Sequence, residues 1–244
     1  MKKHKKNKEV RDNSPVIPQR NKINDSLNIY RRELKPTQQK FMELALDKST
    51  KLMFVSGPAG TSKTYLSVLV ALLLLNEKRV SDLIYIRSAV ESSDSKLGFL
   101  PGEADEKMAP YIQPLLDKLM ELLPKTDIDR LMKENRITAV PVGFLRGLNW
   151  NAKVIIADEA QNLTEKELIT LVTRIGEFSK VFVLGDPDQS DIKDKSGFTR
   201  LMKKFDDEES NSQGIRTFTF TEEDIVRSGL VQFIINRLRK VQLK

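Results

Sequence analysis

The sequence predicts an α/β domain with a mostly parallel sheet, helices on both faces and one helical insertion. Short apolar runs of strand length alternate with segments of helical periodicity. Strands joined through helices pair in parallel, because the chain must cross over before it re-enters the sheet. Several runs end in glycine or charged residues, which is typical of parallel strands whose carboxyl ends face a ligand. The 244 residues suffice for one such domain.

The composition is that of a water-soluble protein, with 39% hydrophobic and 31% charged residues. The chain has no cysteine, which excludes disulfides and thiolate metal sites and suggests a reducing, cytoplasmic setting. Its longest apolar run, residues 66–75, is broken only by Ser67 and is too short to span a bilayer. No apolar segment follows the basic N-terminus, so we expect neither a signal peptide nor a membrane partner.

Most of the net charge of +7 lies near the N-terminus. Residues 1–40 hold twelve Lys or Arg and four Asp or Glu, a balance of +8, so the remainder is close to neutral. Residues 1–30 are polar and are predicted to form a disordered basic arm, followed by a single domain over residues 31–244. The arm either attracts nucleic-acid phosphates or acts as a solubilising tail, and both interpretations stay open.

A glycine-rich turn follows the apolar strand predicted over residues 52–55 and precedes a very apolar helix. This is the layout of a phosphate-binding P-loop, in which glycines let backbone N–H groups point at an anion near a helix N-terminus. Lys63 is expected to reach the β- and γ-phosphates, and the Thr64 hydroxyl to bind Mg²⁺. The residues predicted to hold the nucleotide are Gly57, Pro58, Ala59, Gly60, Thr61, Ser62, Lys63 and Thr64.

Ser62 departs from the usual pattern G-x-x-x-x-G-K-[ST], which has glycine at this position. If the position needs a backbone conformation that glycine favours, serine costs about 1 kcal/mol or more.

A helix is expected to begin near Pro36, with Gln38 in its first turn. An amide there could bind the edge of adenine, although a lone glutamine is more often a surface residue.

A strand over residues 83–87 completes a βαβ unit, and Arg87 ends it. Residues 91–136 then interrupt the α/β alternation with a helical pattern. This insertion either contacts a polymer or a subunit, or it is a flap that completes the core. A short strand is predicted over residues 137–142, and for Trp150 we favour a packed aromatic over a base-stacking platform.

The apolar strand predicted over residues 154–157 ends in Asp158 and Glu159. Carboxylates at this place complement a P-loop. Asp158 is expected to hold the Mg²⁺ water shell, and Glu159 to orient or deprotonate an attacking water.

The rest of the chain continues the alternation. A helix follows a capping box at residues 164–167, and a strand over residues 181–184 precedes Gln189, a candidate γ-phosphate contact. The acidic run at residues 206–209 is interpreted as a solvated loop. A last strand is predicted over residues 216–220, before an amphipathic helix at the C-terminus.

Taken together, these motifs resemble a superfamily-one helicase ATPase core, and more closely the PhoH family of phosphate-starvation-inducible ATPases. The resemblance covers roughly residues 34–235. It depends on Thr37-Gln38, Gly57-Pro-Ala-Gly-Thr-Ser-Lys-Thr64, Gly98-Phe-Leu-Pro-Gly102, Arg146-Gly147, Asp158-Glu-Ala-Gln-Asn162, Thr173-Arg-Ile-Gly176, Gly185-Asp-x-x-Gln189 and Asp224-Ile-Val-Arg227.

The resemblance implies one RecA-like domain that binds and hydrolyses ATP with Mg²⁺, coupled to RNA or single-stranded DNA. It supports Gln38 as an adenine contact and Gln189 as a coupling residue. A single RecA-like domain supplies half of a helicase ATP site, so the arginine that stabilises transition-state charge must come from its C-terminal part or a neighbour. Arg227 and Arg174 are the candidates, and we expect a head-to-tail ring, a hexamer.

Two other functions remain as alternatives. A nucleotide-gated scaffold would bind ATP without motor activity. A small-molecule kinase would need an acceptor pocket and a basic lid, and neither is visible in the sequence.

Overall fold

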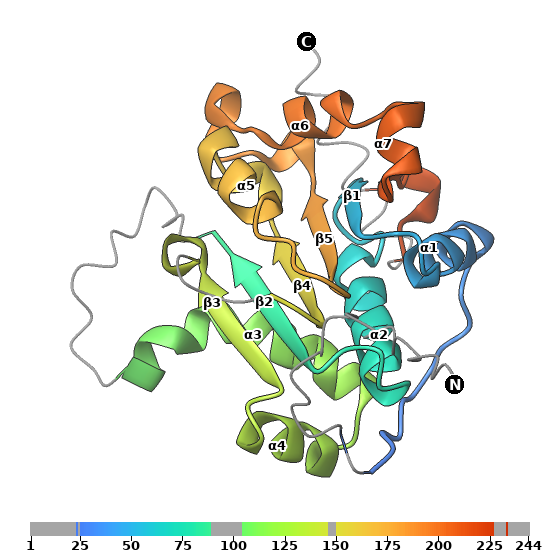
Figure 1. Ribbon diagram of the computed structural model, residues 1–244, viewed down its shortest axis with the longest axis vertical. Helices are drawn as coiled ribbons and strands as arrows, with labels where there is room; N and C mark the ends of the chain where they lie inside the picture. The colour runs from blue at the N-terminus through green and yellow to red at the C-terminus, as the bar shows by residue number, and fades with distance from the viewer. Residues whose placement is uncertain (1–22, 24, 89–103, 146–149, 227–232, 234–244) are drawn as a thin grey trace, which may run out of the picture.

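The computed structural model describes residues 23, 25–88, 104–145, 150–226 and 233. Six strands form one sheet in the order β3-β2-β4-β5-β1-β6, and every pairing is parallel. The predicted α/β class is confirmed (Figure 1). The strands are β1 (Leu52–Ser56), β2 (Asp82–Arg87), β3 (Ile137–Pro141), β4 (Lys153–Asp158), β5 (Lys180–Gly185) and β6 (Ile215–Thr219).

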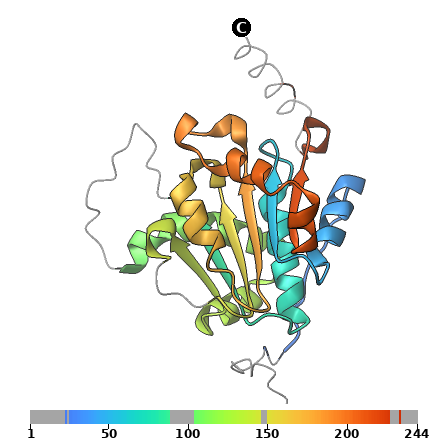
Figure 2. The ribbon, with the colours of Figure 1, turned by 45° about the horizontal axis from the view of Figure 1, so that its top comes forward.

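The central strands are continuous apolar runs because helices cover both faces of the sheet. The strands point the same way, so their carboxyl ends gather along one edge (Figure 2). Strand β5 lies between β1 and β4, with Ser56 opposite Gly185 and Ala157 opposite Val183. The P-loop, the acidic pair after β4 and the polar turn after β5 therefore meet at this edge.

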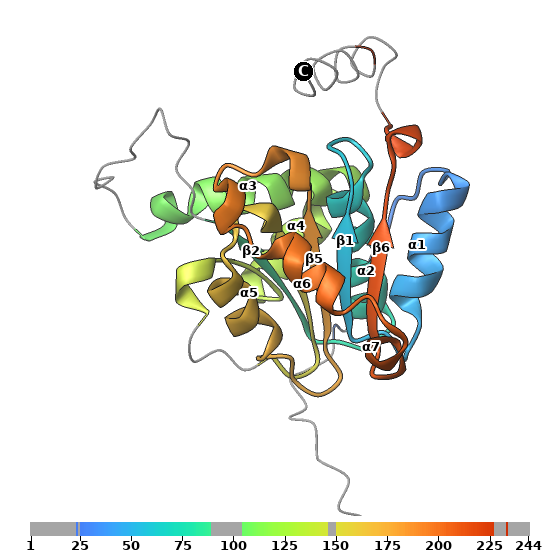
Figure 3. The same ribbon diagram turned by 90° about the horizontal axis from the view of Figure 1, so that it is seen from above.

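One face of the sheet is covered by α2 (Lys63–Asn76), α3 (Ala104–Leu122) and α4 (Lys125–Lys133) (Figure 3). Helix α2 is buried from Tyr65 to Leu75, as its apolar sequence predicts. Helix α1 (Pro36–Leu46) flanks α2 and contributes Phe41, which packs near Phe182, Phe218 and Phe220.

The opposite face is covered by α5 (Glu165–Val172) and α6 (Phe198–Lys204). The capping box predicted before α5 is present, with Thr164 and Glu167 bonding each other's backbone N–H groups. Trp150 packs in this core and is 1% exposed, which confirms the packed-aromatic interpretation.

The acidic run at residues 206–209 is exposed to solvent throughout, as predicted, but only Asp206 and Asp207 lie in a loop, whereas Glu208 and Glu209 are helical. Asp207 caps a short helix, α7 (Glu208–Ser212), by accepting the Ser210 N–H at 2.8 Å. An aspartate that begins a helix satisfies backbone donors that the helix itself leaves unpaired. The remaining helices are the 3₁₀ turns η1 (Val142–Phe144), η2 (Ala160–Asn162), η3 (Pro187–Gln189), η4 (Lys193–Lys195) and η5 (Glu222–Asp224).

The insertion is helical, as predicted, over the part that the structure describes. Helix α3 continues through both of its prolines, Pro110 and Pro114. Leu115, Leu119 and Leu131 are completely buried in the core shared with α2. This packing favours the core-completing flap, and residues 91–103 lie outside the described ranges.

Residues 25–35 form a strap that runs along α2 from its C-terminal to its N-terminal end. Leu27 is 6% exposed, and its N–H donates to Asn76 Oδ1 at 2.8 Å. The Tyr30 N–H donates to the Leu122 carbonyl at 2.8 Å. The folded domain therefore begins before residue 31, earlier than predicted, while residues 1–22 and 24 lie outside the described ranges.

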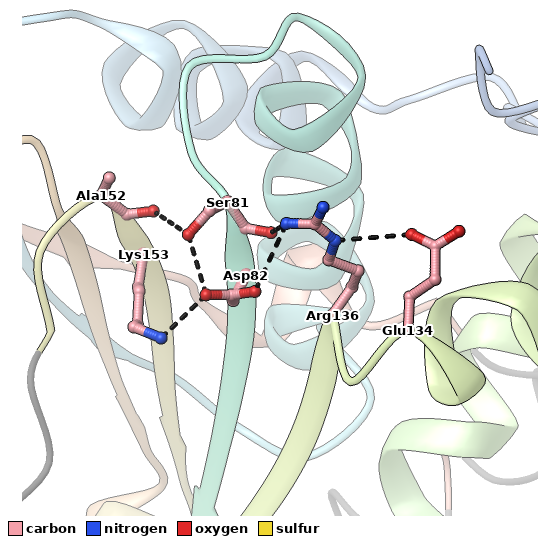
Figure 4. A network of polar contacts seen from close by, with 6 residues as sticks. All are labelled: Ser81, Asp82, Glu134, Arg136, Ala152 and Lys153. Carbon is pink, nitrogen blue, oxygen red and sulfur yellow. Dashed lines mark hydrogen bonds and ion pairs between the residues drawn. The ribbon is translucent and has the colours of Figure 1, made fainter. Parts of the chain in front are cut away.

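The amino edge of the sheet contains a buried charge network (Figure 4). Asp82, 2% exposed, lies 2.8 Å from Lys153 Nζ and 3.8 Å from Arg136 Nη1. These residues begin or precede β2, β4 and β3, so one carboxylate links the starts of three strands. Among the described residues, no helix is long and apolar enough to cross a bilayer.

Candidate functional site

A polar cavity of about 350 Å³ opens at the carboxyl edge, above the ends of β1, β4 and β5. It contains side chains of both charges, from the P-loop, the acidic pair, the strap and the insertion. The cavity is lined by Arg32, Ala59, Gly60, Ser62, Lys63, Thr64, Tyr65, Lys118, Glu121, Asp158, Glu159, Gln161, Leu184, Gly185, Asp186, Gln189 and Val226.

The P-loop begins with a glycine that no other residue could replace without movement. Gly57 has φ +152°, and a Cβ there would lie 2.7 Å from Phe220 Cβ. The loop is tied to the next strand, since Gly57 N–H donates to the Gly185 carbonyl and Ala59 N–H to Asp186 Oδ2 at 2.9 Å. Pro58 and Thr61 support the turn from within, because Thr61 Oγ1 donates to the Pro58 carbonyl at 2.9 Å.

Ser62 adopts the left-handed conformation, with φ 72° and ψ 22°. The position therefore has the backbone conformation that glycine favours, which is the condition under which we expect serine to cost about 1 kcal/mol or more. Ser62 is the N-cap residue of α2 and so places Lys63 at the first position of the helix.

Lys63 and Thr64 begin α2. Lys63 Nζ donates to the carbonyls of Gly57 and Pro58 at 2.6 and 3.1 Å, which holds the ammonium over the loop. The N–H groups in the first turn of a helix, such as that of Thr64, have no acceptor inside the helix. The helix dipole and these donors together favour an anion in the cavity.

Asp158 meets the P-loop across the sheet. Thr64 Oγ1 lies 3.0 and 3.2 Å from the two carboxylate oxygens of Asp158. The Tyr85 hydroxyl on β2 also donates to Asp158, at 2.5 Å. Burial, followed by the adjacent carboxylate, raises the pKa of Tyr85, so this hydroxyl stays protonated as a donor.

Glu159 is held by a glutamine that also contacts β5. Gln161 Nε2 donates to Glu159 Oε2 at 2.6 Å, and Gln161 Oε1 accepts the Asp186 N–H at 3.0 Å. Gln161 lines the cavity but is 1% exposed, so this bridge lies at the base of the cavity. Glu159 itself has φ 53°, a left-handed backbone that follows directly from the end of β4.

The two candidate glutamines occupy different places. Gln189, at the end of η3, lines the cavity. Gln38 does not line it: the side chain is 1% exposed and its Oε1 accepts the Lys35 N–H at 3.1 Å, which caps α1. Its Nε2 is buried and has no hydrogen-bond partner in the part of the chain that the structure describes.

Arg174, one of the two candidate arginines, does not line the cavity of its own chain. Arg174 follows α5 near Gly176, whose backbone packs against Asn151 at the amino edge, the far side of the sheet. Its Nε is buried and has no hydrogen-bond partner among the described residues. Arg227 lies outside the described residues, although its neighbour Val226 lines the cavity and donates its N–H to the Gly60 carbonyl at 2.8 Å.

Several residues of the site were not among the predicted site residues. Tyr85 does not line the cavity but holds Asp158 from beneath; it lies in an apolar strand, where its hydroxyl gives no signal in sequence. Gln161 and Asp186 belong to quoted motifs, and their position directly after strands could have identified them. Arg32 belongs to the strap, and Lys118 and Glu121 belong to the insertion. No local sequence pattern indicates that these two segments reach the carboxyl edge of the sheet.

Thr64 and Asp158 fit a magnesium ion, because both offer oxygen ligands and Mg²⁺ retains several waters in such sites. Among the described residues, no group of three or more acidic or histidine side chains could hold a metal. The donor set therefore favours an ion bound jointly by protein, water and phosphate.

Comparison with known proteins places this geometry in context. A family model described as PhoH-like protein matches residues 32–239. A PhoH-like protein of Bacillus subtilis (strain 168) is 37% identical over 202 residues, which are 81% of this chain and 61% of that protein. A PhoH-like protein of Mycobacterium tuberculosis (strain H37Rv) is 37% identical over 201 residues, 82% of this chain and 55% of that protein. Protein PhoH of Escherichia coli (strain K12) is 34% identical over 189 residues, 76% of this chain and 52% of that protein.

Proposed function

The chain belongs to the PhoH family, and from this premise we propose that it binds ATP with Mg²⁺ and hydrolyses it, coupled to RNA or single-stranded DNA. The chain spans about half to three fifths of the length of the curated relatives described above. The activity proposed here is therefore that of the domain present in this sequence.

One observation carries the proposal. The Thr64 hydroxyl and the Asp158 carboxylate, 94 residues apart in sequence, meet within 3.0 Å beside the Lys63 ammonium. A cation, a hydroxyl and a carboxylate in this order are what a nucleoside triphosphate and its Mg²⁺ require from a P-loop site. Bound Mg²⁺ would neutralise charge on the β- and γ-phosphate oxygens.

The roles of the protein groups follow from their positions. Lys63 would exchange its contacts with the loop carbonyls for the β- and γ-phosphates. Glu159, kept in place by Gln161, would orient the attacking water or accept a proton from it. Gln189 lines the cavity as a γ-phosphate contact would. The adenine contact proposed for Gln38 requires its buried side chain to become accessible, because Gln38 is 1% exposed and does not line the cavity.

The place of Arg174, one candidate for the arginine finger, supports a ring of subunits. Arg174 lies at the far edge of its own sheet, so in this conformation it could reach an ATP site only in a neighbouring subunit. A head-to-tail interface that closes gives a ring, and we propose a hexamer on this basis. Arg227 stays the alternative finger. A cytoplasmic setting, expected from the cysteine-free sequence, is part of the same proposal.

ATP turnover, measured with increasing RNA or single-stranded DNA, tests this function. Wild-type protein should hydrolyse ATP faster with one of the strands, and Lys63→Ala should lose nucleotide binding or turnover. Lys133→Ala, at the end of α4, is a matched control because it removes the same charge away from the cavity. Equal turnover of wild type and Lys63→Ala would refute the assignment.

The same assay separates the alternative function. A nucleotide-gated scaffold would bind ATP, but nucleic acid would not stimulate turnover. Deletion of residues 1–22 tests whether the basic arm is an electrostatic tether. In that case the deletion should weaken stimulation mainly at low salt, where phosphate attraction is strongest.

A further inference from the structure

Arg32 is held against the P-loop by two contacts that the sequence motif does not include. Its Nη2 donates to Ser62 Oγ at 2.8 Å. Its Cζ lies 3.9 Å from the centroid of the Tyr65 ring, which is close enough for a cation–π interaction. A residue of the strap, 30 positions before the motif, thus reaches the mouth of the cavity.

The charge of Arg32 is available to an anion. The cavity contains two other cations: Lys118 forms an ion pair with Glu121, and Lys63 donates to the loop carbonyls. The contacts of Arg32 with described residues are to a neutral hydroxyl and a neutral ring, and no carboxylate pairs with it there. Arg32 is an exposed residue that lines the cavity, so a ligand can reach it.

The position of Arg32 indicates which part of a nucleotide it could contact. Glu159 and Gln189 mark the γ-phosphate end of the cavity, and Arg32 has no contact with either among the described residues. It is held instead by Ser62 and Tyr65, which flank the Lys63-Thr64 pair in sequence. The backbone around such a pair surrounds the α- and β-phosphates.

We propose that Arg32 binds the α- or β-phosphate of the nucleotide, the part that ADP and ATP share. Ser62 provides the hydroxyl that orients the guanidinium, and this role accounts for a serine where the backbone is left-handed and the usual residue is glycine. The inference rests on the proposed function, because it needs a nucleotide in this cavity.

Equilibrium binding of ADP and of a non-hydrolysable ATP analogue to the full chain tests the proposal. Arg32→Gln should raise the Kd for both ligands by the same factor, about tenfold at low salt, as for one lost charge-assisted contact. The factor should shrink at high salt, since the guanidinium is exposed. Arg31→Gln is the matched control: it removes the same charge one residue away, outside the cavity, and should change Kd by less than about twofold.

A second variant keeps Arg32 and removes its anchor. Ser62→Gly should relieve the left-handed strain and raise the melting temperature, yet weaken ADP binding several-fold. In the double variant, Ser62→Gly should add nothing to the loss caused by Arg32→Gln, because both changes remove the same interaction. Additive losses would show that Ser62 does not act through Arg32.

Three results would overturn the role of Arg32. Equal Kd values for Arg32→Gln and Arg31→Gln would show that it does not bind nucleotide. A loss confined to the ATP analogue would assign it to the γ-phosphate, and tighter binding would mean that it competes with the ligand. If the wild type bound neither nucleotide, both the proposed function and the role of Arg32 would fail. If the wild type bound nucleotide and Arg32→Gln bound it equally well, only the role of Arg32 would be refuted.

Discussion

The Tyr85 hydroxyl donates to the Asp158 carboxylate at 2.5 Å, from one strand of the sheet to its neighbour. Both side chains lie on the face covered by α2, whose first turn contributes the Thr64 hydroxyl to the same carboxylate. A hydrogen bond to a metal-binding carboxylate fixes its orientation and can change metal affinity by about 10- to 100-fold.

Tyr85→Phe removes this donor and keeps the ring. We expect the variant to need about tenfold more Mg²⁺ for half-maximal nucleotide binding, because Asp158 loses its orienting contact. A Mg²⁺ titration of nucleotide binding measures the shift. Tyr30→Phe, which removes a hydroxyl from the exposed Tyr30 ring outside the cavity, is the control. An unchanged Mg²⁺ requirement in Tyr85→Phe would show that the hydrogen bond only stabilises the fold.

Asp82 is expected to be important for stability and not for nucleotide binding. Asp82→Ala removes the carboxylate that the buried Arg136 and the nearby Lys153 share, while Arg136 keeps its ion pair with Glu134. The free energy of unfolding should fall by about 3 kcal/mol, the lower end of the range for breaking a buried ion pair. Urea unfolding measures this change. Asp129→Ala, an exposed position on α4, should cost less than about 0.5 kcal/mol. A small loss in Asp82→Ala would mean that the network in Figure 4 contributes little.

Lys180 should make stability rise with pH under alkaline conditions. Burial, aided by the nearby Arg79, lowers the pKa of Lys180 from 10.5 to about 8, and its Nζ donates to the Asp47 and Thr50 carbonyls. Between these two pKa values the unfolded chain binds a proton that the folded chain does not. Folding therefore becomes more favourable as the pH rises from 8 towards 10.5.

The comparison of wild type with Lys180→Met isolates this effect. Methionine does not titrate, so the difference in unfolding free energy between the two proteins should change in favour of the wild type as pH rises from 8 to 10.5. Urea unfolding at several pH values measures that difference. A constant difference across the window would contradict the lowered pKa.

Motifs at strand ends were predictable from sequence, because a parallel sheet brings the carboxyl ends of its strands together. Thr64 and Asp158 were both expected at one magnesium site from the P-loop and an acidic strand end, and the structure brings them together. Tyr85 was not predictable in this way, since a tyrosine within an apolar run gives no sign of where its hydroxyl points.

Contacts between segments far apart in the sequence could not be predicted from local sequence patterns either. Leu27 appeared to belong to a polar arm, but it is buried because the strap crosses α2 and completes the core. Asp207 looked like part of a solvated acidic run, and its role as a helix cap depends on the short helix that follows it.

The central claim is that this cavity hydrolyses ATP with Glu159 as the residue that activates water. Glu159→Gln keeps the size and hydrogen-bonding capacity of the side chain but removes its charge, so ATP binding should persist while turnover falls by about 100-fold or more. Glu177→Gln, an exposed position at the far edge of the sheet, serves as the control. Bound ATP and turnover should be measured on the same samples. Retained binding with lost turnover is the result that our account predicts, and turnover equal to wild type would contradict it.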